Sequence, residues 1–284
     1  YGADILRIWV ASSNYAEDLR IDYSILDQHS DSYRKIRNTF RYLLGNLNDK
    51  FEEIDLTKID LEKLPELERY ILNKVYILNN KFHNYFKSYD FHNLYKELLN
   101  FCTVDLSAFY FDIRKDTLYC DNLNSVKRKS CVMVLNVLLN ALLRWFAPIL
   151  SFTSEEIYQL ISKENKSIHL KKFLSVPEKL NDDHILKKWN ELIKIREVCN
   201  ISIEEKRATK EIGSSLEAEL KLNLNSKYKK ILTNIDLSEL CIVSKAEISF
   251  DEQSDIFVKT NKASGDKCPV CWKISVEPCA RHPK

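Results

Sequence analysis

The sequence predicts a mainly α-helical fold, in which a helical bundle is followed by a small α+β module that ends in a metal-binding tail. Three observations support this prediction. Glycine and proline number only 4 and 6 among 284 residues, which disfavours turn-dense all-β folds and glycine-rich nucleotide cradles. Apolar residues recur with helical periodicity from Tyr33 to Leu160, and three of the eight cysteines lie in the last 17 residues.

Three amphipathic helices are predicted first. One carries its apolar residues on a single face from Tyr33 to Leu47. Pro65 suits the first turn of the second helix, and Asp90 can cap the third. Their apolar faces hold, in turn, Ile36, Phe40, Leu43 and Leu44; Leu67, Ile71, Val75, Leu78 and Phe82; and Leu94, Leu98, Phe101, Cys102 and Phe109.

Two further helices complete the predicted bundle. The stretch from Ser125 to Phe146 is almost wholly apolar after its basic start, which predicts a central and largely buried helix. Thr153 with Glu156 three residues later forms a capping box that opens a shorter helix. Amphipathic helices joined by modest connections are typical of a bundle.

A small α+β module is predicted after a linker between Lys163 and Asp183, where Lys, Asn and Ser accumulate without a period. A sixth helix begins near Asp183. From Leu216 to Leu224 apolar and polar residues alternate, which predicts a half-buried strand. The other predicted elements are a short helix over 227–232 and strands over 241–243, 246–250 and 256–259.

Charge and motifs exclude several classes of protein. The 43 Lys and Arg residues against 41 Asp and Glu residues give a net charge of +2, so a nucleic-acid surface would have to arise from local patterning. No uninterrupted apolar run approaches the roughly 18 residues of a spanning helix, and no membrane partner is expected. The sequence holds no P-loop, GxSxG or HExxH motif, so we assign no catalytic residue and expect a binding module.

The strongest chemical signal is a pair of metal-ligand motifs near the end of the chain. Cys268-x-x-Cys271 and Cys279-x-x-His282 are separated by seven residues, which predicts one structural zinc ion in a tetrahedral site. A surface dithiol or a redox pair is the alternative, although Pro269 within the first motif does not fit a thioredoxin-like site. Sequence beyond residue 284 could also supply the fourth ligand in place of His282.

The remaining cysteines are expected to be buried thiols, which indicates a reducing compartment. They are Cys102, Cys120, Cys131, Cys199 and Cys241.

A basic stripe lies on the first predicted helix. Arg34, Arg37 and Arg41 fall on one side of the helical wheel, with Lys35 further round. Guanidinium groups at this spacing can bind consecutive phosphates. Spacing alone favours an ordinary solvated helix face.

Several segments together resemble the bacterial-type isoleucyl-tRNA synthetase family, and they extend over essentially the whole chain. They are residues 1–13, the Tyr-Arg-Lys-Ile-Arg-Asn-Thr run of 33–39, residues 105–112, 147–150 and 152–156, residues 212–216, and Lys267-Cys268 with Cys271-Trp272. The resemblance implies a class I aminoacyl-tRNA synthetase that activates isoleucine with ATP and transfers it to tRNA(Ile). It also favours the phosphate-binding interpretation of Arg34, Lys35, Arg37 and Arg41.

The family's adenylate-forming signatures, His-Ile-Gly-His and Lys-Met-Ser-Lys-Ser, are absent from this sequence. The resemblance therefore implies that ATP and isoleucine bind only in the upstream catalytic domain and that this chain alone is inactive. Because the chain starts at Tyr1 and its one methionine is Met133, we expect a fragment of a longer protein. The family commonly ends with a second Cys-x-x-Cys, where this chain has His282 as its fourth candidate ligand.

By analogy the chain divides into four parts. Residues 1–30 resemble a stem-contact segment that joins the catalytic domain, 31–170 an anticodon-binding helical bundle, 171–260 an α+β junction module, and 261–284 a zinc-binding tail. The expected partners are tRNA(Ile) and the upstream catalytic and editing domains, and we expect a cytoplasmic monomer. The alternative is a zinc-stabilised helical protein-interaction module without ligase activity, which would show little salt-dependent affinity for tRNA.

Overall fold

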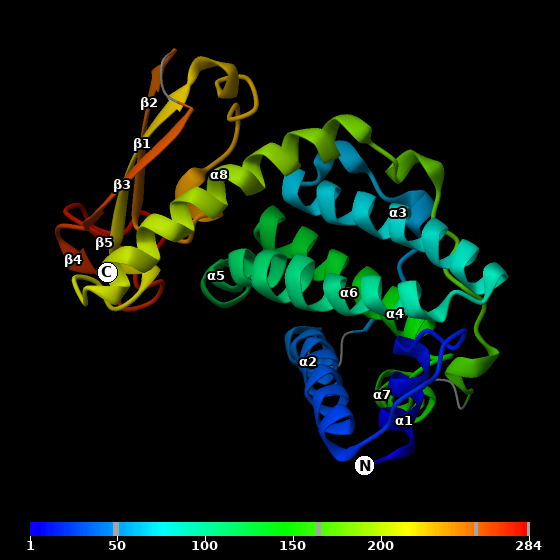
Figure 1. Ribbon diagram of the computed structural model, residues 1–284. Coiled ribbons are helices and arrows are strands. Elements are labelled where there is room, and N and C mark those ends of the chain that lie inside the picture. Colours follow the sequence, from blue (N-terminus) through cyan, green and yellow to red (C-terminus); the bar gives the residue numbers. More distant parts are fainter. Residues whose placement is uncertain (48–50, 163–165, 253–254, 283–284) are drawn as a thin grey trace. The chain divides into compact units, whose positions relative to one another are not determined.

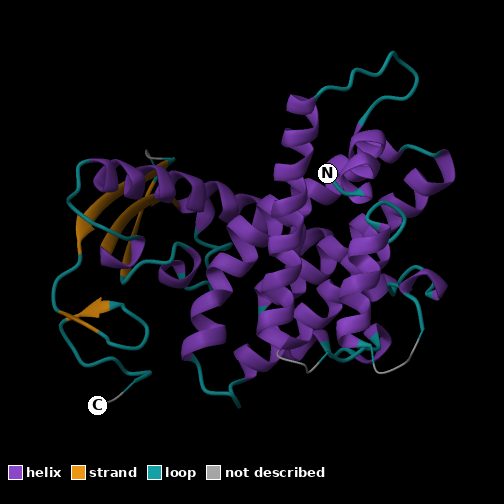
Figure 2. Ribbon diagram, turned by 90° about the horizontal axis from the view of Figure 1, so that it is seen from below, coloured by secondary structure: helices purple, strands orange, loops and turns teal. Residues whose placement is uncertain are grey.

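The computed structural model describes residues 1–47, 51–162, 166–252 and 255–282. The chain divides into two compact units. The first comprises residues 1–114 and 123–182, and the second comprises 115–122 and 183–284. The prediction of a mainly helical chain with a small C-terminal sheet is confirmed (Figures 1 and 2).

Helices form almost all of the first unit (Figure 1). They are α1 (Ala3–Ser12), α2 (Tyr23–Leu47), α3 (Glu66–Ser88), α4 (Phe91–Asn100), α6 (Val126–Phe146) and α7 (Ser151–Ile161). A π-helical segment, η3 (Phe101–Phe111), continues α4 into α5 (Asp112–Cys120), whose residues from 115 onward belong to the second unit. Single 3₁₀ turns lie at Leu56–Lys58, Leu61–Lys63, Ile168–Leu170 and Glu178–Leu180.

Helix α6 is the centre of the bundle, as its apolar sequence predicts. Trp145 is fully buried, and its ring meets that of Phe82 edge-on at 5.0 Å. The Trp145 Nε1–H donates to Asn79 Oδ1 at 3.1 Å, so the one polar atom of the indole is satisfied. By length and composition α6 could cross a membrane, but 78% of its apolar window is buried inside the protein. This burial is typical of the core helix of a bundle.

Helix boundaries follow the predictions where local capping determines them. The Asp90 carboxylate accepts from Asn93 N at the start of α4, and Ser125 caps α6. Helix α2 starts at Tyr23, ten residues before the predicted start. In those ten residues only Leu26 is buried, so the exposed first part of the helix shows no apolar period.

The predicted capping box of Thr153 and Glu156 is wrong. Helix α7 already begins at Ser151, which places Thr153 inside its first turn. The Thr153 hydroxyl hydrogen-bonds the Asp4 carboxylate at 2.6 Å, and Glu156 pairs with Arg37 at 3.2 Å. Both side chains are therefore used in tertiary contacts within the first unit.

The second unit combines one long helix with a three-stranded sheet. Its elements are α8 (Asp183–Ala208), β1 (Ala218–Asn225), α9 (Leu237–Leu240), β2 (Lys245–Asp251), β3 (Ile256–Lys262), β4 (Asp266–Lys267) and β5 (Ile274–Ser275), with 3₁₀ turns at Ser215–Glu217 and Ser226–Tyr228. The strand order is β2-β1-β3, in which β1 runs parallel to β2 and antiparallel to β3.

The prediction of a half-buried strand is confirmed by β1. Leu220, Leu222 and Leu224 are buried, and the residues between them are not. Helix α8 packs on the sheet, and its Ser202 hydroxyl contacts that of Thr260 in β3 at 2.7 Å.

Two smaller predictions in this unit are wrong. Residues 241–243 do not form a strand, because Cys241 ends α9 and Ile242 has a positive φ of 56°. Cys241 and Val243 are buried by tertiary packing, so apolar residues occur here without a strand. The predicted helix over 227–232 is only the 3₁₀ turn of Ser226–Tyr228, followed by turns.

Candidate metal centre and basic helix face

A short hairpin carries the first two candidate ligands. Strands β4 and β5 pair antiparallel, and Cys268 and Cys271 lie in the connection between them. The Cys268 N–H donates to Lys273 O at 2.9 Å, and the Trp272 N–H donates to Cys268 O at 3.0 Å. Gly265 is required here, because its φ is +116° and an added Cβ would lie 2.2 Å from the Ser275 carbonyl carbon.

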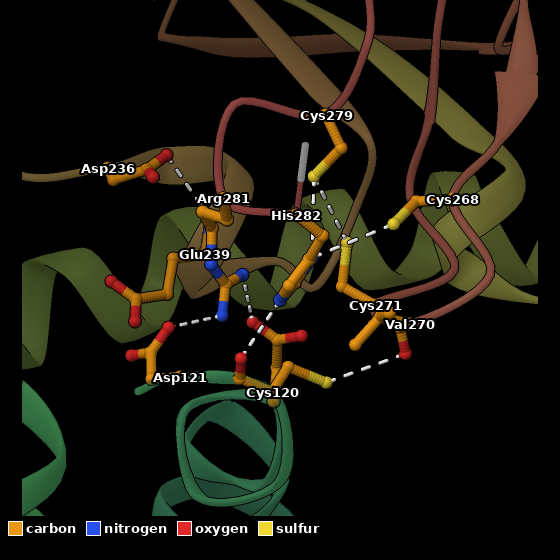
Figure 3. A network of polar contacts seen from close by, with 11 residues as sticks. Cys120, Asp121, Asp236, Glu239, Cys268, Val270, Cys271, Cys279, Arg281 and His282 are labelled. Carbon is orange, nitrogen blue, oxygen red and sulfur yellow. Dashed lines mark hydrogen bonds and ion pairs between the residues drawn. The ribbon is translucent and has the colours of Figure 1, made fainter. Parts of the chain in front are cut away.

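The structure brings all four predicted ligands together (Figure 3). His282 Nδ1 lies 3.6 Å from Cys268 Sγ and 3.5 Å from Cys279 Sγ. Cys271 Sγ lies 3.8 Å from Cys279 Sγ, and all four ligand atoms lie within 4.8 Å of one another. Cys268 and Cys271 are buried, while Cys279 and His282 are partly exposed.

These distances fit a closed tetrahedral metal centre. With zinc–sulfur bonds of about 2.3 Å and zinc–nitrogen bonds of about 2.0–2.1 Å, a tetrahedron has sulfur–sulfur edges of about 3.8 Å and sulfur–nitrogen edges of about 3.5 Å. The three contacts among the cysteine sulfurs and His282 Nδ1 have these lengths. Three thiolates and one imidazole are also a soft donor set of the kind that zinc prefers. The cluster can therefore hold a metal ion.

Backbone hydrogen bonds lower the pKa of one candidate ligand. The N–H groups of Cys271 and Val270 lower the pKa of the Cys268 thiol to about 6, which favours the thiolate that binds metals. Burial raises the pKa of Cys271 to about 12. A cation at the centre of the cluster would offset that burial by stabilising the thiolate.

The imidazole of His282 is oriented by a backbone carbonyl from a distant part of the sequence. Cys120 is the last residue of α5. The His282 Nε2–H donates to the Cys120 carbonyl oxygen at 2.9 Å. This hydrogen bond raises the pKa of His282 and leaves Nδ1 directed at the three sulfur atoms. Metal-binding histidines commonly donate their second ring N–H to a carbonyl or carboxylate in this way.

Sequence reasoning missed the acidic residues that hold the neighbouring Arg281. Its guanidinium group pairs with Asp116 and Asp121, both at 2.5 Å. These partners lie 165 and 160 residues earlier in the sequence. No spacing pattern in the sequence connects them, and the last turn of α5 has no basic residue of its own.

The four predicted phosphate-binding residues all lie exposed on α2, in the first unit. Arg34 pairs with Asp31 at 3.0 Å, one helical turn away. Arg37 pairs with Glu156 of α7 and also donates to the Tyr33 hydroxyl at 3.1 Å. Among the described residues, Lys35 and Arg41 have no ion-pair partner. We call these four residues the basic face.

Comparison with known proteins gives one family and a consistent set of relatives. Residues 68–222 match the family described as the anticodon-binding domain of tRNA ligase. The chain is 68% identical over 282 residues to the isoleucine–tRNA ligase of Pelagibacter ubique (strain HTCC1062), which covers 99% of this chain and 31% of that relative.

Two more isoleucine–tRNA ligases show the same partial overlap. That of Zymomonas mobilis is 41% identical, over 96% of this chain and 29% of the relative. That of Brachyspira hyodysenteriae is 39% identical, over 96% of this chain and 30% of the relative. The chain thus spans less than a third of the length of these relatives.

Proposed function

Because the chain belongs to the family of anticodon-binding domains of tRNA ligases, we propose that it is the tRNA-recognising C-terminal portion of an isoleucine–tRNA ligase. The observation that carries this proposal is the family match over residues 68–222, which includes most of the helical bundle. The parent protein attaches isoleucine to tRNA(Ile) with ATP. ATP and isoleucine bind only in the upstream catalytic domain, so this chain binds tRNA without aminoacylating it.

The basic face is proposed to contact tRNA phosphates. Its four cations are exposed on a single helix, and Lys35 and Arg41 carry charge that no described acidic residue neutralises. Arg34 and Arg37 have ion-pair partners at the surface, where such pairs are weak and can be exchanged for phosphate. Residues 31–170 then act as the anticodon-binding bundle, and residues 1–30 connect to the catalytic domain.

Zinc is the metal proposed for the cluster of Cys268, Cys271, Cys279 and His282. Four protein ligands fill a tetrahedral site, so a bound ion supplies a structural cross-link and no open position for chemistry. The zinc site stabilises the tail at 261–284, which follows the junction module at 171–260. The protein is proposed to work in the cytoplasm as a monomer.

A tRNA titration at several salt concentrations tests the proposed function. The wild-type chain should prefer tRNA(Ile), and its affinity should fall as salt rises. Replacing Arg34, Arg37 and Arg41 by Gln should flatten the slope of log affinity against log salt by about 0.7–0.9 for each lost phosphate contact. A control variant has the same change in charge but leaves the basic face intact: Lys187→Gln, Lys194→Gln and Arg207→Gln on α8. Its slope should equal that of the wild-type chain.

Two results would contradict the proposal. Equal slopes for the two triple variants would exclude the basic face as a phosphate site. Weak binding of tRNA that does not depend on salt would favour the protein-interaction module instead.

Metal content is tested separately by elemental mass spectrometry of the purified chain. We expect one zinc ion per chain, with loss in the Cys268→Ser and His282→Ala variants. Zinc content that is indifferent to His282→Ala would show that another group is the fourth ligand.

A further inference from the structure

The candidate metal centre is attached to the end of a helix that contributes no ligand (Figure 3). Cys120 ends α5, and its carbonyl accepts from His282 Nε2 at 2.9 Å. The Cys120 thiol in turn lies 3.6 Å from the carbonyl oxygen of Val270, between the first two cysteine ligands. All of these residues belong to the second unit. The two sides of the metal cluster therefore both contact the same helix end.

Arg281 strengthens this attachment through charge. One guanidinium group lies between two carboxylates, Asp116 Oδ2 on Nη1 and Asp121 Oδ1 on Nη2. The exposed fractions of the three side chains are 35%, 30% and 18%, so they are partly shielded from water. Partly buried charges of this kind are screened less by salt than fully exposed ion pairs are.

The end of α5 favours a nearby cation. The C-terminus of a helix carries partial negative charge, which makes nearby carboxylates unfavourable. Asp116 and Asp121 lie near this end, and the last turn of α5 has no basic residue of its own. Arg281 supplies positive charge at this end through its ion pairs with both carboxylates. Since residue 281 directly precedes the candidate ligand His282, placing this charge also places the imidazole.

We propose that the end of α5 is a positioning element of the metal centre, in which Arg281 holds His282 against the Cys120 carbonyl through its ion pairs with Asp116 and Asp121. This inference rests on the proposed zinc site. Because binding free energies are reciprocal, docking of the tail on α5 raises metal affinity by the same factor by which metal strengthens docking. The Arg281 backbone N–H hydrogen-bonds the Cys279 sulfur, and the Arg281 side chain acts through the position of its neighbour His282.

The test measures zinc affinity of the full chain by competition with a chromophoric chelator at fixed pH. In Arg281→Gln, and in the double variant Asp116→Asn with Asp121→Asn, zinc affinity should fall by about 10- to 100-fold, as it does when groups that orient metal ligands are removed. Glu204→Gln is the matched control, because it removes an arginine–carboxylate pair of 2.6 Å in the same unit whose two residues both belong to α8. Its affinity should stay within about twofold of wild type.

A second measurement follows the helix end without measuring affinity. Hydrogen exchange of the amides at 117–122 should slow when zinc is added to the wild-type chain, and this protection should disappear in the Arg281→Gln variant. The double aspartate variant leaves the whole tail sequence unchanged. A loss of zinc affinity in this variant therefore reflects lost contact with α5 and not a mutation that misfolds the tail itself.

The outcomes distinguish this inference from the proposed zinc site. A wild-type chain that binds no zinc would overturn the zinc site itself. A wild-type chain that binds zinc, with the same affinity in both variants and no protection at 117–122, would overturn only the positioning role of α5.

Discussion

Asp4, in the first turn of α1, caps helix α7 from 149 residues away. Its Oδ2 accepts from the Thr153 N–H at 2.8 Å and from the Thr153 hydroxyl at 2.6 Å, and its Oδ1 accepts from the Phe152 N–H at 3.4 Å. Leu150, the residue that precedes α7, has no side-chain acceptor to offer. A carboxylate at a helix N-terminus also complements the helix dipole.

Removal of the Asp4 cap should lower the free energy of unfolding by a large amount for one polar residue. Asp4 is buried at 6% exposure, so Asp4→Ala leaves the N–H groups of α7 without an acceptor. The free energy of unfolding of the bundle should fall by about 2 kcal/mol, and by less in Asp4→Asn, which keeps one oxygen acceptor. Urea unfolding followed by circular dichroism measures this. A loss below about 0.5 kcal/mol for Asp4→Ala would show that the cap contributes little.

Breaking the buried ion pair of Arg114 and Glu68 should lower the free energy of unfolding still further. Arg114 Nε and Nη2 donate to the two oxygens of Glu68, both at 2.6 Å, and the side chains are 3% and 0% exposed. Glu68→Gln replaces the carboxylate beside a buried guanidinium group with a neutral amide and should cost about 3–5 kcal/mol of unfolding free energy. Glu204→Gln, which breaks an exposed arginine pair, should cost less than about 1 kcal/mol. Urea unfolding measures the loss of unfolding free energy in both variants. Equal losses would show that burial of the ion pair does not determine its effect on stability.

The stability of the bundle should depend on pH through Glu53. Partial burial by itself raises the pKa of Glu53, but hydrogen bonding and charge from Arg144, together with Lys171, outweigh it and lower the pKa below its ordinary value. Since the pKa is lower in the folded state, the stabilisation is complete above the ordinary value near 4.5 and disappears as pH falls through the folded-state pKa.

This dependence is measured by urea unfolding of wild type and Glu53→Gln between about pH 7 and pH 3, a range that spans ordinary carboxylate pKa values. The difference in unfolding free energy should shrink toward the acid end. A difference that stays constant across this range would exclude Glu53 as its source.

Glu156 limits the charge of the basic face. It pairs with Arg37 at 3.2 Å, and both side chains are exposed, at 56% and 46%. Glu156→Gln should release Arg37 and tighten tRNA binding at low salt by about two- to fivefold, the equivalent of one surface ion pair. Glu191→Gln on α8 frees Lys194 in the same way and should leave the affinity unchanged. If both variants tighten binding equally, the effect reflects net charge alone.

Removal of zinc should release the tail and leave the bundle folded. The bundle has its own core around α6, with Trp145, Phe82 and Phe146 fully buried. Chelation should therefore speed hydrogen exchange at 268–282 while the amides of α6 stay protected. Loss of protection in α6 on chelation would mean that the metal stabilises the bundle as well.

Periodicity in the sequence was sufficient to predict most of the secondary structure. The faces of α3 and α4 and the alternation of β1 were predictable because each depends on which side of a single element is buried. The four cysteine and histidine residues were predictable as a cluster because two short motifs hold ligand pairs together locally. Prediction failed at 241–243, where burial comes from tertiary packing and not from a strand.

The polar contacts that join distant segments could only be found in the folded chain. Asp4 and Thr153, Arg37 and Glu156, and Arg281 with Asp116 and Asp121 are each pairs of ordinary surface residue types separated by more than 100 positions. Side-chain spacing carries information over one or two helical turns, because it reports which residues share a face. Which faces meet depends on how the apolar cores pack, and the charged partners follow from that packing. The candidate metal ligands were therefore visible in the sequence, while the helix end that contacts them appeared only in the fold.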